Sequence, residues 1–384
     1  MPKAIYCDQA ATSFPKPGTV IEAVVQALSR VSASPGRSAH GYSLEASRLV
    51  FNARETVAEF LGVDDSSRIV FTLNVTQALN LALSGWLRPG DHVLTTDLEH
   101  NSVMRPLAWL SQERGVEVEV VPSGPDGLIR PREFEARRRP ETRLAVVNHA
   151  SNVTGAISPV QEIKAALGNV PVLLDVAQTA GCLPLPPAEQ LADLIAFTGH
   201  KSLLGPTGTG GLWVGPGLEL KPLVHGGTGS RSEQERQPDF MPDALEAGTP
   251  NTHGLAGLAA GIRFVLETGL DRIRSHELEL TGLFLDGLSL IKGIEVYGPD
   301  KAEARVAVVS LNLDGWSPSD LALALEREYG VMVRAGLHCA PRAHRTIQTF
   351  PRGAVRFSFG WFNTPREVVA VLAALNDLAR RPGP

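Results

Sequence analysis

The sequence of 384 residues predicts an α/β fold: a mostly parallel sheet of seven strands with helices on both faces, followed by a smaller α+β domain. Between residues 68 and 214, short apolar runs alternate with helical patterns, which is typical of such a sheet. Residues 215–250, rich in Gly, Pro and charge, break the alternation. We expect a large domain over 14–262 and a small one over 263–384, because a chain of this length exceeds a single core.

Apolar runs bounded by turn residues place the strands. The seven strands expected in the large sheet span residues 69–72, 92–96, 116–121, 144–148, 172–175, 194–197 and 211–214. A short strand is expected at 5–8, and the small domain should hold strands at 294–297, 305–313, 331–334 and 354–358.

Helical periodicity places the helices. The expected helices span residues 18–29, 44–61, 76–86, 102–114, 131–138, 159–167, 252–268, 273–291, 318–329 and 365–380. In the helix at 44–61, Arg54 is expected on the solvent face while Val57 and Phe60 pack inward. The loop at 215–250, roughly 35 residues long, exceeds the usual connection length, so we expect it to be functional or to contact a partner.

Composition excludes several classes of protein. Hydrophobic residues make up 43% and charged residues 20%, which is ordinary for a soluble globular protein. The net charge of −5 is slight and no basic run contains aromatic residues, so nucleic acid is not an expected partner. No apolar stretch reaches the roughly 18 residues of a membrane span, and residues 1–4 lack the apolar core of a signal peptide. We therefore expect a cytoplasmic protein with no membrane partner; no metal site is expected.

The candidate chemistry begins with one lysine and one aspartate. Lys201 follows the apolar run at 194–197 and precedes a glycine-rich turn, while Asp175 ends the run at 172–175. Ligands of parallel sheets bind beyond the carboxyl ends of the strands, so both side chains should face one crevice. Pyridoxal phosphate needs a lysine for its imine and a carboxylate at its pyridine nitrogen. The competing interpretation of Lys201 alone is a solvated surface charge.

Motifs along nearly the whole chain make the interpretation more specific. They run from Asp8-Gln9-Ala10-Ala11-Thr12, through Lys201, to the Arg-x-Gly-x-His-Cys loop that ends at Cys339 and to Arg356-Phe357-Ser358. The sequence resembles the cysteine desulfurases of the class V aminotransferase family, and within them the second group. The resemblance implies a fold type I pyridoxal-phosphate enzyme, a homodimer, L-cysteine as substrate and residues 1–13 lining the active site. The family usually has Asn where this chain has Gln9, so the role of Gln9 is open.

The resemblance also assigns residues to the cofactor. It implies phosphate contacts from Thr76, Thr198 and His200, with Thr249 reaching in from a second subunit. At Thr76 the local sequence equally allows a plain helix N-cap. The resemblance stacks His100 on the pyridine face, where it moves protons. It assigns Asn152 and Gln178 to the substrate carboxylate and the phenolic oxygen of the cofactor, and Arg356 to the α-carboxylate of the substrate.

The three cysteines differ in their surroundings. Three in a chain of this length argue against a disulfide framework. Cys7 and Cys182 lie among apolar or small residues and should pack in the core. Cys339 lies in a loop bounded by Gly and Pro with an arginine and a histidine nearby, and positive neighbours stabilise the thiolate that a sulfur acceptor needs. The resemblance implies that Cys339 carries the sulfur as a persulfide.

We therefore expect an enzyme that converts L-cysteine to L-alanine and passes the sulfur through Cys339 to an acceptor, which can be a protein. A selenocysteine or cysteine-sulfinate lyase, or an aminotransferase, would use the same lysine, aspartate, histidine and arginine, and only Cys339 separates these alternatives. A cofactor-binding scaffold or sulfur-relay partner without turnover is the third hypothesis. Intact Asp175, Lys201 and Arg356 argue against it.

Overall fold

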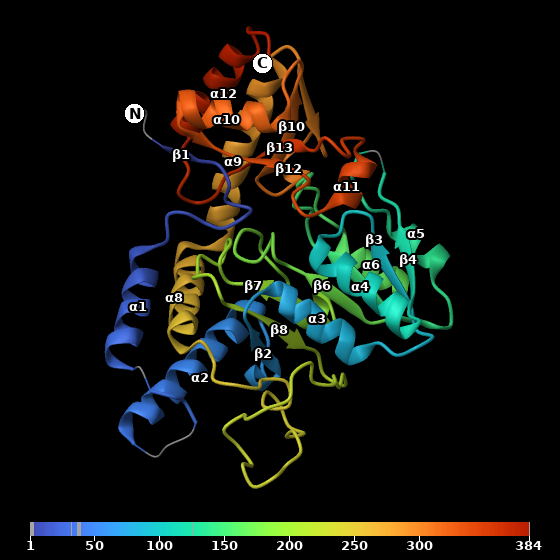
Figure 1. Cartoon of the computed structure of the whole chain (residues 1–384), viewed down its shortest axis with the longest axis vertical. Helices are drawn as coiled ribbons and strands as arrows, with labels where there is room; N and C mark the ends of the chain where they lie inside the picture. Colours follow the sequence, from blue (N-terminus) through green and yellow to red (C-terminus); the bar gives the residue numbers. More distant parts are fainter. Residues whose placement is uncertain (1–3, 32, 37–39, 125, 384) are drawn as a thin grey trace.

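The computed structural model describes residues 4–31, 33–36, 40–124 and 126–383. Its larger part is built on a seven-stranded sheet with the order β2-β8-β7-β6-β5-β3-β4 (Figure 1). The strands are β2 (Ile69–Thr72), β3 (His92–Thr96), β4 (Glu117–Val121), β5 (Thr142–Asn148), β6 (Val172–Asp175), β7 (Leu194–Thr198) and β8 (Gly210–Val214). The pairs β3–β4, β3–β5, β5–β6 and β6–β7 are parallel, while β8 pairs antiparallel with β2 and β7. The expected mostly parallel sheet is confirmed.

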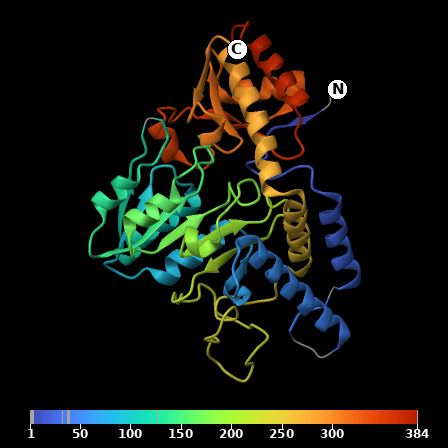
Figure 2. The same ribbon diagram turned by 180° about the vertical axis from the view of Figure 1, so that it is seen from behind.

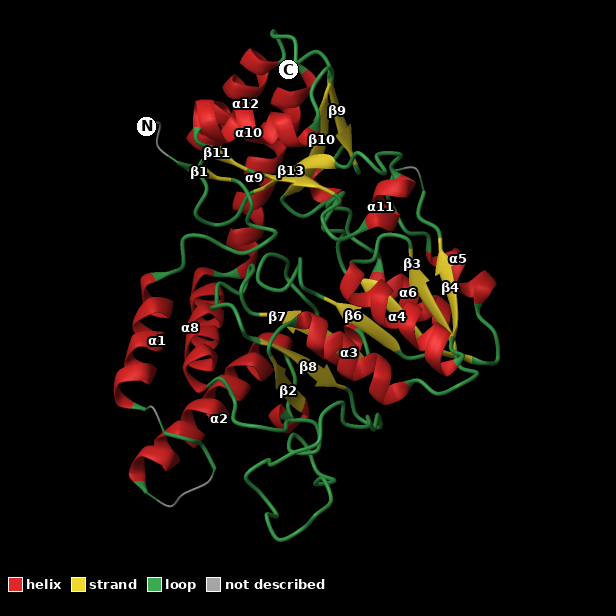
Figure 3. Cartoon of the chain, viewed as in Figure 1, coloured by secondary structure: helices red, strands yellow, loops and turns green. Residues whose placement is uncertain are grey.

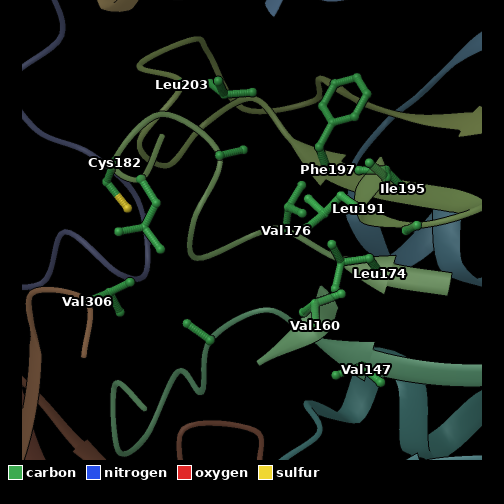
Figure 4. Packing of buried hydrophobic residues seen from close by; sticks show 14 of the residues in the cluster. Val147, Val160, Leu174, Val176, Cys182, Leu191, Ile195, Phe197, Leu203 and Val306 are labelled. Carbon is green, nitrogen blue, oxygen red and sulfur yellow. The ribbon is translucent and has the colours of Figure 1, made fainter. Parts of the chain in front are cut away.

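Both faces of this sheet are covered because successive residues of its strands point to opposite faces. Val146 belongs to the core cluster that contains residues of the helices α3 (Val75–Trp86) and α4 (Asn101–Arg114), whereas its neighbour Val147 belongs to the cluster that contains residues of α2 (Gly41–Leu61), α6 (Val160–Leu167) and α8 (Thr252–Thr268). Figure 4 shows Val147, Leu174 and Ile195 side by side on the second face. The helices are α1 (Gly18–Arg30), α2 (Gly41–Leu61), α3 (Val75–Trp86), α4 (Asn101–Arg114), α5 (Pro131–Arg137), α6 (Val160–Leu167), α7 (Ala188–Leu191) and α8 (Thr252–Thr268), with a short 3-10 turn at Ser66–Arg68. The four-residue helix α7 was not predicted.

One residue of α2 lies opposite to expectation. Arg54 is buried rather than solvent-facing, and its guanidinium forms two hydrogen bonds with Glu246, of 2.7 and 2.9 Å. It also donates to the carbonyl oxygen of Ile69 and lies over the ring of Phe71. A buried charge is tolerated when it is paired and hydrogen-bonded. The prediction for Arg54 was wrong because its partner, Glu246, comes from a loop nearly two hundred residues away.

The long segment at 215–250 contains neither helix nor strand, as expected. Figure 3 shows it as a loop that projects below the large sheet. Glu246 of this segment binds Arg54 of α2, and Arg54 donates to Ile69 of β2, so the segment is attached to both elements. No helix in the described part of the chain is long and apolar enough to cross a membrane.

The smaller part has its own sheet and core. The strands β9 (Ile294–Tyr297), β10 (Val308–Leu313), β12 (Arg334–Gly336) and β13 (Ala354–Ser358) form an antiparallel sheet in the order β12-β13-β10-β9. Helices α9 (Leu270–Ser289), α10 (Pro318–Tyr329) and α12 (Pro365–Leu378) pack on it, and α11 (Pro341–Thr346) and a 3-10 turn (Ala302–Ala304) complete it. The N-terminal strand β1 (Ile5–Tyr6) pairs in parallel with β11 (Val331–Met332). Strand β1 therefore packs against the smaller part, which comes much later in the sequence.

The two parts meet at the junction of α8 and α9. Viewed from behind, α8 lies against the large part and α9 rises into the small one (Figure 2). Gly269, with φ of 89°, separates the two helices. Ile262 and Val265, on either side of the expected boundary at 262, lie in the same helix and the same core cluster. The domain boundary stays a prediction.

Candidate active site

A pocket lies beyond the carboxyl ends of the parallel strands, where ligands of such sheets bind. Asn148 and Asp175 are register partners at the ends of β5 and β6, and β7 ends three residues before Lys201. The pocket is lined by Val75, His100, Ser102, Asn148, Ala150, Asn152, Asp175, Ala177, Gln178 and Lys201. The structure thus brings Asp175 and Lys201 to one crevice and places His100, Asn152 and Gln178 there with them.

Lys201 has an unusual electrostatic environment. Burial lowers the pKa of its amine from 10.5 to about 8, and the positive charges of Arg356 and Arg334 act in the same direction, while Asp175 opposes them. A lysine shifted in this way has a larger neutral fraction near neutral pH, which is the form that attacks an aldehyde. Its position is fixed by the N-terminal turn, because Ser13 donates a 2.8 Å hydrogen bond to the carbonyl oxygen of Lys201.

Asp175 is buried at the end of β6. Its Oδ1 accepts a 2.9 Å hydrogen bond from the backbone N–H of Ala177. Burial raises the pKa of Asp175, and the Ala177 hydrogen bond and the charge of Lys201 partly offset this shift. A cationic group bound in the pocket would stabilise the carboxylate further.

His100 caps helix α4 and also faces the pocket. Its Nδ1 accepts from the backbone N–H of Ser102 at 3.0 Å and lies 2.8 Å from the Ser102 hydroxyl. Burial, with the charges of Lys201 and Arg334, lowers the pKa of His100 to about 4. The ring is therefore neutral near pH 7, and its proton lies on Nε2 because Nδ1 is an acceptor. The capping role and the predicted stacking role are compatible.

The predicted phosphate contacts divide into three groups. The Thr198 hydroxyl and His200 Nδ1 are buried and have no hydrogen-bond partner among the described residues. Thr76 is exposed in the first turn of α3, but it does not cap the helix, because the N-cap is Asn74, whose side chain accepts from the Gln77 N–H. The local alternative for Thr76 was therefore wrong. Thr249 is exposed and lies outside this pocket, in a hollow that also contains Leu73 and Gly208.

The N-terminal segment reaches the site through its backbone, with residues 1–3 outside the described part. Gln178 donates from Nε2 to the carbonyl oxygen of Ala10 at 3.2 Å. Gln9 itself is occupied elsewhere: its amide donates to Phe14 at 2.7 Å and to Asn363 at 3.2 Å, and accepts from the Phe14 N–H. Gln9 therefore shapes the turn and does not line the Lys201 pocket.

Arg356 is buried on β13 and is oriented from two sides. Its Nη2 donates to Asp8 Oδ1 at 2.8 Å, and its Nη1 donates to the carbonyl oxygen of Asn152 at 3.1 Å. Nε of Arg356 and Oδ1 of Asn152 are both buried without a partner in the part of the chain that is described. The amide nitrogen of Asn152 is held by the carbonyl oxygen of His338 at 2.7 Å. This corner therefore offers one unused donor and one unused acceptor.

Cys339 is exposed, whereas Cys7 and Cys182 are buried, as expected. Figure 4 shows the sulfur of Cys182 within the apolar core, and burial raises the pKa of both buried thiols. Cys339 Sγ lies 3.8 Å from Nη2 of Arg334, and its carbonyl oxygen accepts from the Asn101 N–H at 2.7 Å. Asn101 follows His100, so the cysteine loop is attached to the wall of the pocket.

Sequence reasoning missed three contributors. Asp8 was quoted only as part of a motif, although it forms the ion pair with Arg356. Lys16 donates to the carbonyl oxygen of His200 at 2.9 Å, beside Lys201, and burial lowers its pKa to about 8. Glu99 is fully buried beside His100, and burial raises its pKa to about 8. The position of Glu99 between Leu98 and His100 could have indicated a buried acid beside the site. Nothing in the local sequence indicated that Asp8 or Lys16 would take part.

The donor set fits pyridoxal phosphate. A phosphate needs several hydrogen-bond donors, and the buried, unpartnered Thr198 hydroxyl and His200 Nδ1 belong to the segment that leads from the end of β7 to Lys201. The cofactor ring needs a carboxylate at its nitrogen and an amine at its aldehyde, which Asp175 and Lys201 can supply. Among the described residues no group of His, Cys, Asp and Glu could hold a metal ion.

The fold and this arrangement define a class of protein, which comparison with known proteins identifies. The family model described as aminotransferase class-V matches residues 5–371, and the chain belongs to this family. Relatives bear a more specific name: a probable cysteine desulfurase from Methanothermobacter thermautotrophicus is 35% identical over 98% of this chain and 94% of its own. A second, from Aeropyrum pernix, is 36% identical over 97% of this chain and 94% of its own.

Solved structures agree with these relatives. The apo structure of a cysteine desulfurase from Thermococcus onnurineus NA1 matches with a TM-score of 0.91 at 32% identity, covering 98% of this chain and 95% of that one. The cysteine desulfurase CsdA from Escherichia coli matches with a TM-score of 0.86 at 28% identity, over 98% and 94%. The predicted family and fold class are confirmed. Membership of the second group stays a prediction.

Proposed function

We propose that this chain is a pyridoxal-phosphate-dependent cysteine desulfurase that converts L-cysteine to L-alanine and leaves the sulfur on Cys339 as a persulfide. The observation that carries the proposal is the attachment of an exposed thiol to a lysine–aspartate pocket. The carbonyl oxygens of His338 and Cys339 are each bound at 2.7 Å, by Asn152 and Asn101. The names of the relatives support the same activity.

The pocket residues divide the work of holding the cofactor. Asp175 would lie at the ring nitrogen, Lys201 at the aldehyde, Gln178 at the phenolic oxygen and His100 over the ring face. Thr76, Thr198 and His200 would hold the phosphate. When bound, the cofactor serves as an electron sink for the bonds around the α-carbon of the amino acid.

The protein's own residues position the substrate and move its protons. Arg356, held by Asp8 and by the Asn152 carbonyl oxygen, has Nε free to bind the α-carboxylate, and the unpaired Oδ1 of Asn152 lies in the same corner. Lys201, whose pKa is lowered to about 8, takes the α-proton as general base and returns it later. Neutral His100 presents the N–H of Nε2 to the pocket.

Sulfur transfer then needs only the thiolate of Cys339. Its Sγ attacks the sulfur of the bound cysteine, an S–S bond forms, and the Cβ–S bond breaks with its electron pair passing to the amino acid fragment. Protonation of that fragment gives alanine. Cysteine plus the enzyme thiol therefore equals alanine plus the enzyme persulfide, with no external oxidant or reductant. The guanidinium of Arg334 donates to Sγ at 3.8 Å and so faces the attacking sulfur.

The site is proposed to be completed by a second subunit. Thr249 is exposed and lies in a different hollow from Lys201 of the same chain, and we assign it to the phosphate in a partner's pocket. The persulfide would then pass to an acceptor, with an acceptor protein as one candidate. A selenocysteine or cysteine-sulfinate lyase and an aminotransferase are the competing activities, because they share every group except Cys339.

Substitution of the three cysteines tests this function. Cys339→Ser should keep the cofactor spectrum and its change on adding L-cysteine, while sulfide and alanine production collapse. Cys7→Ala and Cys182→Ala, the buried matched controls, should retain both products. Mass spectrometry after brief exposure of the wild type to L-cysteine should find one added sulfur on the Cys339 peptide, removable by reductant. Alanine production by Cys339→Ser at the wild-type rate would refute the desulfurase mechanism and leave the cofactor assignment standing.

A further inference from the structure

Three buried polar side chains form a chain of hydrogen bonds behind the Cys339 loop. Nε2 of His338 lies 3.1 Å from the carbonyl oxygen of Arg334, and Nδ1 of His338 lies 3.2 Å from Nε2 of His344. Nδ1 of His344 lies 2.6 Å from the hydroxyl of Thr349. The three residues are only 4%, 0% and 6% exposed, so the His338–His344 and His344–Thr349 bonds are shielded from water, while the bond to the Arg334 carbonyl is part-buried.

The Arg334 carbonyl oxygen, at one end of this series of hydrogen bonds, determines which atom donates in each of them. A carbonyl oxygen can only accept, so Nε2 of His338 carries the proton. Nδ1 of neutral His338 is then an acceptor, which requires the proton of His344 to lie on Nε2. Nδ1 of His344 is in turn an acceptor, and the Thr349 hydroxyl must donate to it.

Both imidazoles are neutral under ordinary conditions. Burial lowers the pKa of His338 to about 2, with the charges of Arg356 and Arg334 acting in the same direction, and burial lowers the pKa of His344 to about 4. Each ring therefore has one donor and one acceptor, and a single arrangement of protons satisfies all three bonds. Removing the Thr349 hydroxyl would leave Nδ1 of His344 unpaired in the core.

This series of hydrogen bonds ends at the segment that carries the reactive sulfur, Cys339. His338 and Cys339 have φ of 50° and 56°, a left-handed conformation that residues other than glycine adopt rarely. Such conformations persist where surrounding contacts over-determine them, and they concentrate at functional sites. Here the contacts are the two bound carbonyl oxygens and the fixed ring of His338. The ring bonds the carbonyl of Arg334, the residue whose guanidinium faces Sγ.

We propose that His344 and Thr349 are positioning residues for sulfur transfer, because they fix the His338 ring and thereby the backbone that aims Cys339 Sγ at the substrate. Neither residue lines the Lys201 pocket. The inference rests on the proposed role of Cys339 as sulfur acceptor and adds two residues that act through it.

Thr349→Val tests the series of hydrogen bonds directly, since valine keeps the shape of the threonine side chain and removes its hydroxyl. In purified, cofactor-loaded protein we expect the single-turnover rate of persulfide formation on Cys339 to fall about tenfold or more, the usual scale for a misplaced reacting group. The rate should fall by a larger factor than KM for L-cysteine rises, because Lys201 is untouched and Arg356 keeps its ion pair with Asp8. Thr349→Ser, which restores the donor, should recover most of the rate. The rate at which iodoacetamide labels Cys339 in the absence of L-cysteine should change in the same variants as the rate of persulfide formation. This labelling is a readout that does not depend on turnover.

The matched control is another buried threonine bonded to a histidine. The Thr142 hydroxyl lies 2.8 Å from Nδ1 of His92. The two residues begin β5 and β3, at the opposite ends of these strands from the pocket. Thr142→Val should leave persulfide formation and labelling unchanged. Wild-type sulfur transfer by Thr349→Val, or failure of Thr349→Ser to recover a lost rate, would overturn the inference. If the wild type itself forms no persulfide on Cys339, the proposed function fails instead.

Neutron diffraction from wild-type crystals gives a second measurement that needs no variant. Deuterium is expected on Nε2 of both His338 and His344 and absent from Nδ1 of each. Deuterium on Nδ1 of His344 would overturn the inference whatever the behaviour of Thr349→Val.

Discussion

Nη2 of Arg356 lies 2.8 Å from Oδ1 of Asp8, so the last strand of the small domain is paired with the first segment of the chain. Arg356 is 1% exposed, and its Nε has no hydrogen-bond partner among the described residues. The N-terminal segment therefore sets the orientation of the residue proposed to bind the substrate carboxylate.

Asp8→Asn tests that relationship. It leaves the buried guanidinium uncompensated, so we expect a loss of about 3 kcal/mol in the free energy of unfolding. L-alanine, which brings a carboxylate, should stabilise the variant more than the wild type in urea unfolding. Asp239→Asn, which breaks the exposed pair with Arg231, is the control and should change little. Equal stability of Asp8→Asn and wild type would contradict the prediction.

Lys201→Ala should abolish the covalent attachment of the cofactor. The purified wild type should be yellow, and borohydride should fix the cofactor to the peptide containing Lys201, as mass spectrometry would show. Lys16→Ala is the informative control, because Lys16 is the neighbouring amine whose pKa is also lowered to about 8. We expect it to retain the reducible bond. A reducible bond in Lys201→Ala would mean that the lysine has been misassigned.

Thr249→Ala should weaken cofactor retention if two subunits share each site. Sedimentation should show a dimer, and dialysis should remove the cofactor from the variant faster than from the wild type. Thr228→Ala, in the same long loop, is the control. A fully active monomer would contradict the shared site.

The buried carboxyl of Glu277 should make the free energy of unfolding depend on pH. Burial raises the pKa of this carboxyl on α9 from 4.5 to about 8, so the native state holds the proton more tightly than the unfolded chain. Its contribution is fully present below pH 4.5 and is lost as pH rises through about 8. Glu277→Gln keeps a neutral side chain, so it should be more stable than the wild type by about 1 kcal/mol or more at pH 9, and by much less at pH 5.

Urea unfolding at the two pH values measures this difference. Glu279→Gln, an exposed position on the same helix, should follow the wild type at both. A Glu277→Gln variant whose pH dependence matches the wild type would rule out a buried, proton-binding Glu277.

Local sequence was sufficient for much of the architecture. Strands β2, β3, β6, β9 and β13 and helices α8 and α10 have the predicted bounds, because hydrophobic periodicity reports directly which face of each element is buried. The same logic placed Asp175 and Lys201 in one pocket, since parallel strands end at a common edge. Cys339 could be distinguished from Cys7 and Cys182 by its Gly/Pro-bounded loop and charged neighbours.

Tertiary structure decided the pairings between distant residues. Arg54 finds Glu246 and Arg356 finds Asp8 from far along the sequence, while His338 finds His344 only six residues on, where the cysteine loop leads into the unpredicted helix α11. A pattern of apolar residues specifies which face of an element is buried, but not which polar group lies opposite it. The sequence by itself therefore determined the sheet and the candidate cofactor residues, whereas the fold alone decided which charges are compensated and how Cys339 is held, because those energies depend on contacts between segments far apart in the chain.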